Sequence, residues 1–490
     1  MSNIDLFFNP KNIAVIGASR TPGKIGYNIL ENLKGTFKGQ IYPVNPLATE
    51  IANIQTFPSV ESIPDQVDTA IIAVKAELVP EILQSCIKKK IKAILLLSTG
   101  FEGVENKERL EELKKLLKGK DVLLLGPSAL GTFQPKVIDT LFFTKERLKR
   151  PSEGQIGLIT QSGTIGSSII DRMGSEGIGI SKFIAYGGGV GLNETSLLDH
   201  FGRDLSTRAI ALCIEYISNV PDFIKTASKV AKIKPVVVLK AGKTQKGSEA
   251  VSAHTGVPPG PAEAYSAAFR QAGLLEAKTL EELVDFTKAL ASQPPVPGNS
   301  VAIITDSGGI GILATDSATQ AGFEVPEISK EATKSLKNTL PEGAKISNPL
   351  DLTLAANSEW FQKAVEAASK DKNINAIVVI AQLQSPSIEE SIVDVLRDAK
   401  IYGKPIVVCA NKSDYSLKLT RRMESFGIPV YSTPERAVRA LAALREYGAM
   451  TGAKPKVEEK KEEQKKPAKK ITTKKSKPSI SRHAKKKKKR

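Results

Sequence analysis

His254 is the residue whose surroundings in the sequence most clearly allow chemistry. The 490-residue chain holds three histidines, His200, His254 and His483, and His254 stands in the segment EAVSAHTGVPPG. An imidazole that carries a phosphoryl group must have a ring that is free to move, and small neighbours allow that. The glycine and the prolines predict that His254 lies in a mobile loop. The alternative is a loop histidine that only forms hydrogen bonds.

Two short turns could bind the phosphate that such a histidine would need. They are Ser162-Gly163-Thr164 and Ser307-Gly308-Gly309, and each follows an apolar strand and opens a helix. A helix N-terminus offers free N–H groups and a partial positive charge to an anion. The similarity continues into the following helices, which favours two related domains. The alternative is that any strand-to-helix turn favours serine and glycine.

A glycine-rich turn near the N-terminus predicts a further phosphate site. The segment IAVIGASRTPGKIG contains Gly17, Ala18, Ser19 and Lys24 between an apolar strand and a helix start. Its spacing is not G-x-G-x-x-G, and the next strand ends at Asn45 where a dehydrogenase has an acidic residue for the ribose. A phosphate-rich ligand other than NAD is therefore favoured.

The elements that position these residues follow one repeated pattern. Short apolar, β-branched runs that end in Gly, Ser or Asn alternate with helical periodicity, as in DTAIIAVKA, GLITQSGT and PIVVCANKS. This pattern predicts an α/β protein with parallel sheets covered on both faces. Polar, proline-containing joints divide it into doubly wound domains over residues 1–150, 151–295 and 296–450, followed by a tail over residues 451–490.

Composition places most of the charge in the tail. The net charge is +18, and residues 451–490 alone hold 18 Lys and Arg against four Asp and Glu. We predict that this tail is disordered and serves either solubility or non-specific contact with polyanions such as nucleic acid. Cys86, Cys213 and Cys409 lack C-x-x-C spacing, so we predict buried thiols, no metal site and a reducing, cytoplasmic location. No leader pattern or membrane-spanning apolar run is evident, so no membrane insertion is expected.

The motifs PGKIGYNIL, IYPVNP, GPSALG, TQSGT and AHTG occur in this order in the sequence. Together they resemble the α subunit of archaeal ADP-forming acetyl-CoA synthetase, a member of the NDP-forming acyl-CoA synthetase superfamily that includes succinyl-CoA synthetase. The resemblance covers about residues 1–450. It implies a CoA-binding Rossmann-like domain followed by two flavodoxin-like, succinyl-CoA synthetase-like domains. It also implies an ATP-grasp β subunit that binds ADP or ATP with Mg, in a heterotetramer.

The resemblance also implies the roles of individual residues. His254 would be the phosphorylated histidine, and Glu215 would orient its ring; the alternative for Glu215 is a surface carboxylate at a strand end. Phosphate would attack a small acyl-CoA, and His254 would pass the phosphoryl group of the resulting acyl phosphate to ADP, releasing the carboxylic acid. The residues expected to contact CoA are Gly17, Ala18, Ser19, Lys24, Asn45, Val74, Ser98, Gly100, Gly126 and Pro127.

The sequence departs from the family pattern at positions that bear on substrate choice. Ser128-Ala129 stands where the family often has Asn-Cys, and Lys75 replaces a proline. The loop GGGVGLN over residues 187–193 replaces a more polar, acid-containing stretch, and Asp306 replaces a neutral residue before the second helix start. Two other hypotheses therefore stay open. The chain could be a CoA-binding regulator without catalysis, or a protein that associates with nucleic acid through its tail. The acyl group, the choice of ADP over GDP and the subunit count are left open.

Overall fold

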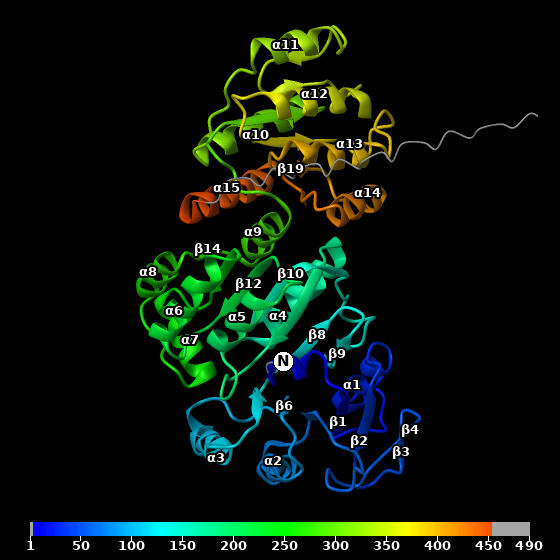
Figure 1. Ribbon diagram of the computed structural model, residues 1–490, viewed down its shortest axis with the longest axis vertical. Coiled ribbons are helices and arrows are strands. Elements are labelled where there is room, and N and C mark those ends of the chain that lie inside the picture. Colours follow the sequence, from blue (N-terminus) through cyan, green and yellow to red (C-terminus); the bar gives the residue numbers. More distant parts are fainter. Residues whose placement is uncertain (1–2, 453–490) are drawn as a thin grey trace, which may run out of the picture.

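The computed structural model describes residues 3–452 as three α/β units that follow one another along the long axis of the molecule, with the N-terminal unit at the bottom of Figure 1. The α/β class with parallel sheets is confirmed. The predicted disordered tail and its polyanion contact lie outside the described residues. Within residues 3–452, no helix combines the length and the apolar character needed to span a membrane.

The first sheet has the strand order β2-β1-β5-β6-β7, and all of its pairings are parallel. Its strands are buried because helices cover both faces. The strands are β1 (Asn12–Ile16), β2 (Gln40–Val44), β5 (Thr69–Ile72), β6 (Ala93–Leu96) and β7 (Leu123–Leu125); the helices are α1 (Ile25–Lys34), α2 (Val79–Lys88) and α3 (Lys107–Leu117). A small hairpin, β3 (Glu50–Ile51) and β4 (Ile54–Gln55), and short 3-10 turns at Asn3–Phe7, Ala76–Leu78 and Val104–Asn106 complete this part.

The second sheet has the order β14-β13-β12-β10-β11-β8-β9. Its strands are β8 (Gly131–Gln134), β9 (Ile138–Asp139), β10 (Glu153–Thr160), β11 (Ile180–Ala185), β12 (Ala209–Ile214), β13 (Val236–Lys240) and β14 (Leu275–Ala277). Its helices are α4 (Gly163–Glu176), α5 (Glu194–Arg203), α6 (Val220–Ala231), α7 (Gln245–Thr255), α8 (Ala262–Ala272) and α9 (Leu280–Ser292). β8 pairs antiparallel with β11, so the sheet crosses the boundary that the sequence places near residue 150. The domain limits themselves stay a prediction.

The third sheet has the order β16-β17-β15-β18-β19-β20. Its strands are β15 (Val301–Thr305), β16 (Lys345–Ile346), β17 (Leu350–Asp351), β18 (Ala376–Ile380), β19 (Ile406–Cys409) and β20 (Val430–Tyr431). Its helices are α10 (Gly308–Gln320), α11 (Lys330–Lys337), α12 (Ser358–Lys370), α13 (Ile392–Ala399), α14 (Asp414–Ser425) and α15 (Pro434–Thr451), with a 3-10 turn at Lys400–Tyr402. α10 follows the inner strand β15 as α4 follows the inner strand β10, so the two serine–glycine turns occupy equivalent places.

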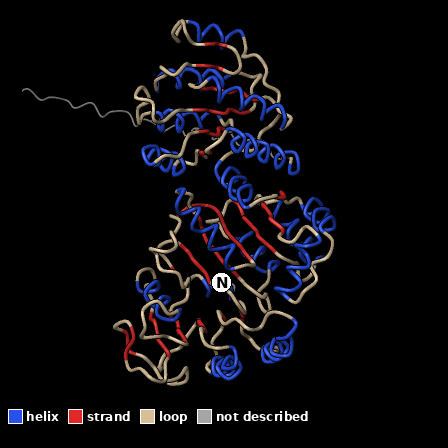
Figure 2. The backbone as a smooth tube through the Cα atoms, turned by 180° about the vertical axis from the view of Figure 1, so that it is seen from behind, coloured by secondary structure: helices blue, strands red, loops and turns tan. Residues whose placement is uncertain are grey.

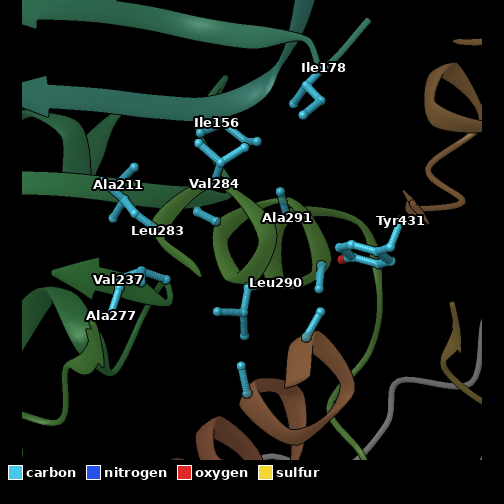
Figure 3. Packing of buried hydrophobic residues seen from close by; sticks show 14 of the residues in the cluster. Ile156, Ile178, Ala211, Val237, Ala277, Leu283, Val284, Leu290, Ala291 and Tyr431 are labelled. Carbon is cyan, nitrogen blue, oxygen red and sulfur yellow. The ribbon is translucent and has the colours of Figure 1, made fainter. Parts of the chain in front are cut away.

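The second and third sheets are joined by the packing of α9 against α15 (Figures 1 and 2). Figure 3 shows that Val284 of α9 points toward Ile156 of β10, while Leu290 points toward the opposite side. One continuous buried cluster contains these residues together with Tyr431 and Leu441 of the third unit. The two sheets therefore share a core rather than only touching at the surface.

Candidate functional site

A cavity of about 730 Å³ opens where the first and second sheets meet. The first unit contributes the turns after β6 and β7 and part of α3. The second contributes the start of α4, the end of β12, the segment after β11 and the end of α7. Charged and polar lining residues are Thr99, Glu102, Lys114, Ser128, Gln161, Ser162, Thr164, Glu215, Tyr216, Ser218, His254 and Thr255. Apolar side chains, among them Phe142 and Phe143, form much of the remaining wall.

The first serine–glycine turn lies in this cavity. Ser162 is the N-cap of α4, and its hydroxyl accepts a hydrogen bond from the Ile165 N–H at 3.4 Å. Gly163 fits closely here, because a Cβ at this position would lie 3.0 Å from the Leu130 Cβ, so a larger residue would force a small shift. The remaining N–H groups of the first helical turn have no partner within the helix, so they can bind an anion in the cavity.

His254 lies in the last turn of α7, not in a loop, so the predicted loop is wrong. Thr244 caps the start of this helix, and Gly256, with φ +74°, caps its end. The small residues that suggested a flexible segment are compatible with a helix. The side chain is still 68 % exposed. Its Nδ1 lies 3.2 Å from Oε2 of Glu215. This contact leaves Nε2 available to a phosphorus atom in the cavity.

Glu215 follows β12, and side chains hold its backbone in place. Oε1 of Gln161 accepts hydrogen bonds from the N–H groups of Glu215 at 2.8 Å and Tyr216 at 3.2 Å. The next two N–H groups, at positions 217 and 218, donate to the Tyr265 hydroxyl at 3.4 Å and to Oε1 of Glu194 at 2.8 Å. Four successive N–H groups are therefore fixed by side chains, which fixes the direction in which the Glu215 carboxylate points.

Sequence reasoning missed these supporting residues. Gln161 could have been found, because it directly precedes Ser162 in the TQSGT motif. Glu194 and Tyr265 carry no comparable signal, since they come from α5 and α8. Burial, reinforced by the nearby carboxylates Glu194 and Glu215, raises the pKa of Tyr216 to about 12, so its hydroxyl stays protonated and donates to the carbonyl of Gly188 at 3.1 Å.

The ten predicted CoA contacts lie along the carboxyl edge of the first sheet. Pro127 is the one that also lines the described cavity. Gly17 has φ +88°, and a Cβ there would lie 2.4 Å from the Ala73 carbonyl oxygen, so this turn needs glycine. The side chain of Asn45 donates to the Ala18 carbonyl at 2.7 Å and so supports the turn. The ten residues lie after the ends of β1, β2, β5, β6 and β7 and in the turn before α1. They are Gly17, Ala18, Ser19, Lys24, Asn45, Val74, Ser98, Gly100, Gly126 and Pro127.

The second serine–glycine turn does not line the cavity that contains His254. A Cβ on Gly308 would lie 3.1 Å from Oδ2 of Asp351, so a carboxylate already faces this helix start. Asp306 is buried, and its Oδ2 accepts the Gln382 N–H at 2.8 Å; burial raises its pKa to about 6. The role of Ser307-Gly308-Gly309 in phosphate binding stays a prediction. Within one copy of the described chain, this turn does not line the cavity that contains His254.

The departures from the family pattern have different surroundings. Lys75 is exposed, whereas Ser128 and Ala129 line the cavity. The Ser128 hydroxyl donates to the carboxylate of Glu102. The loop over residues 187–193 also reaches the cavity, through residues 187–190. Of the departures, Ser128-Ala129 and this loop are therefore the ones that contact the space available to a ligand.

Three family models match the chain in succession. They are a CoA binding domain over residues 11–134, a succinyl-CoA ligase like flavodoxin domain over residues 153–290 and a Ligase-CoA domain over residues 301–450. The fold predicted for the three parts of the chain agrees with this succession.

Similar proteins cover almost the whole chain. The α subunit of ADP-forming acetate–CoA ligase II of Pyrococcus furiosus is 33 % identical over 92 % of this chain and 99 % of its own length. ADP-forming acetate–CoA ligase I of Archaeoglobus fulgidus is 36 % identical over 93 % of this chain, which spans 65 % of that relative. Acetyl-coenzyme A synthetase 1 of Ca. Korarchaeum cryptofilum, solved with phosphate and ADP, has a TM-score of 0.83 and 33 % identity over 92 % of this chain and 98 % of its own.

Proposed function

Because this chain belongs to the family of ADP-forming acetate–CoA ligases, we propose that it is the α subunit of an ADP-forming acyl-CoA synthetase. The reaction interconverts acyl-CoA, ADP and phosphate with the free acid, ATP and CoA. The observation that supports this proposal is the pair of His254 and Glu215, which lies 3.2 Å apart in a cavity that also contains the start of α4.

The residues of the cavity suit a phosphoryl relay. Phosphate on the N–H groups of the α4 start would attack the acyl carbon and form an acyl phosphate, as the carbon–sulfur bond breaks and CoA leaves as the thiolate. Nε2 of His254 would then attack phosphorus, and the carboxylate of the acid would leave. Glu215 would accept a hydrogen bond from Nδ1–H, which keeps the lone pair on Nε2 and stabilises the cationic ring of the phosphohistidine.

The edge of the first sheet suits CoA. Glycine at position 17 lets this turn pack against the end of β5, and Lys24 adds positive charge before α1. CoA would lie along this edge and reach the cavity past Pro127. ADP and Mg would bind to an ATP-grasp β subunit, and two copies of each chain would form a heterotetramer. The location would be cytoplasmic.

Labelling of His254 tests this proposal. The full chain is incubated with acetyl-CoA, radiolabelled phosphate and an ATP-grasp partner protein. We expect an acid-labile, base-stable label that His254→Ala abolishes and that His483→Ala, the matched control, leaves in place. ADP should discharge the label into ATP. A label that persists in His254→Ala, or CoA binding without any label, would reject the relay and favour a CoA-binding regulator.

A further inference from the structure

Glu102 places a second carboxylate in the wall of the cavity that contains His254. It follows β6 in a turn whose glycines Gly100 and Gly103 have φ +94° and +81°. Its Oε2 accepts hydrogen bonds from the N–H groups of Gly100 at 3.1 Å and Phe101 at 3.2 Å. Its Oε1 accepts the Ser128 hydroxyl. Three donors from two turns therefore hold this carboxylate at the cavity wall.

Within residues 3–452, Glu102 forms no ion pair with a lysine, arginine or histidine. Arg109 follows in α3, but its guanidinium donates to the Gly100 carbonyl at 2.7 Å and pairs with Glu77 at 3.2 Å. Lys114 is the lysine that lines the cavity, and it is exposed and pairs with Glu111 at 2.8 Å. The Glu102 carboxylate is thus held at the cavity wall by neutral donors.

This carboxylate lies close to the place where the acyl group must react. Gly103 packs against the end of α7: a Cβ on Gly256 would lie 3.5 Å from the Gly103 carbonyl carbon. Gly256 is two residues beyond His254, and both His254 and Glu102 line the same cavity. An acyl phosphate within reach of the His254 ring therefore shares this space with Glu102.

We propose that Glu102 is a specificity-determining residue. It excludes acyl groups that carry a free carboxylate besides the reacting carbonyl group, and it admits uncharged acyl groups. This inference rests on the proposed acyl-CoA synthetase function. At an assumed separation of about 7 Å, two carboxylates in a partly enclosed site repel each other enough to lower binding on the order of tenfold or more. Aliphatic and aromatic acyl groups instead meet the apolar part of the wall, which includes Phe142 and Phe143.

The test compares acetyl-CoA with succinyl-CoA in the full chain together with its ATP-grasp partner. The measured quantity is the ratio of kcat/KM for succinyl-CoA to kcat/KM for acetyl-CoA. Glu102→Gln keeps an oxygen that can accept the same N–H bonds but removes the charge. Glu102→Asp keeps the charge. Glu105→Gln is the matched control, because Glu105 is in the same turn but is exposed and does not line the cavity.

We expect Glu102→Gln to raise the ratio about tenfold or more, while Glu102→Asp and Glu105→Gln keep the wild-type ratio. A ratio that stays the same in Glu102→Gln, or rises equally in Glu105→Gln, would overturn the inference. Calorimetric affinities of the full chain for the two acyl-CoA thioesters should change in the same sense. Because this binding measurement does not require phosphoryl transfer, failure of the inference and failure of the proposed relay give different results.

Discussion

The second sheet meets its two neighbours in different ways. Toward the first sheet it leaves a cavity lined by helix N–H groups, His254 and Glu215. Toward the third sheet, α9 and α15 fill the space and enclose ion pairs. Nε and Nη2 of Arg436 bind the two oxygens of Asp285 at 2.7 and 2.8 Å. The comparison teaches that the open contact leaves helix N–H groups available to a ligand, whereas the filled contact pairs its buried charges with one another.

At the filled contact, between the second and third sheets, buried charged side chains have several partners. Lys288 binds Glu424 at 2.9 Å and the Val430 carbonyl at 2.6 Å, and its Nζ lies 4.0 Å from the ring centroid of Tyr431. Lys412 at the start of α14 binds Glu176 at the end of α4 at 2.7 Å. Charges removed from water are stable only when such partners replace it, so these contacts fix the angle between the two sheets.

Asp285→Ala is expected to have the largest effect on stability. It leaves Arg436 buried, with the more exposed Glu281 as its remaining carboxylate partner. Removing one partner of a buried pair costs about 3–5 kcal/mol, which a denaturant titration of the full chain would measure. Glu153→Ala breaks the exposed pair with Lys136 and is the control, with an expected cost of about 0.5 kcal/mol or less. Equal losses would remove the distinction between the two contacts.

Gln161→Leu is expected to act on catalysis at the open contact. Without the Gln161 acceptor, the backbone of Glu215 and Tyr216 can shift, and a misplaced catalytic group typically costs about 100-fold in kcat. KM for acyl-CoA should change little. Gln161→Glu keeps an acceptor oxygen at the same reach, so its kcat should stay well above that of Gln161→Leu, while the added carboxylate should raise KM for phosphate. If both variants lose activity equally, the role of Gln161 is not the positioning of Glu215.

Glu176→Gln is expected to show a smaller, pH-dependent effect at the filled contact. Although burial alone would raise it, Lys412 and Arg172 lower the pKa of Glu176 to about 2, below the ordinary value of 4.5. A folded-state pKa below the unfolded one means that the stabilisation is complete above pH 4.5 and is lost as the pH falls toward 2. Between pH 6 and pH 3, the free energy of unfolding should fall by about 2 kcal/mol more in wild type than in Glu176→Gln, as measured by urea unfolding. Parallel losses would contradict this assignment.

Much of the fold follows from local sequence patterns, but the support of the site does not. The apolar runs predict the parallel strands, and Ser162 before Gly163 predicts the start of α4, because both signals are local. The loop predicted for His254 was wrong, since alanine and serine suit a helix as well as a loop. The contacts of Gln161 with Glu215, and of Glu102 with Ser128, join segments between 26 and 54 residues apart, and no local pattern reports them.

The attachment of α7 has a consequence for how a phosphoryl group could travel. Along this helix Val251 is the one buried residue, whereas α4 buries Gly166, Ile169, Ile170 and Met173. Detaching α7 would therefore expose little apolar surface and cost little hydrophobic free energy. Glycines with left-handed backbone conformations, Gly242 and Gly256, lie on either side of it. The helix that carries His254 is thus weakly attached to the second sheet, and the glycine on each side of it can act as a hinge.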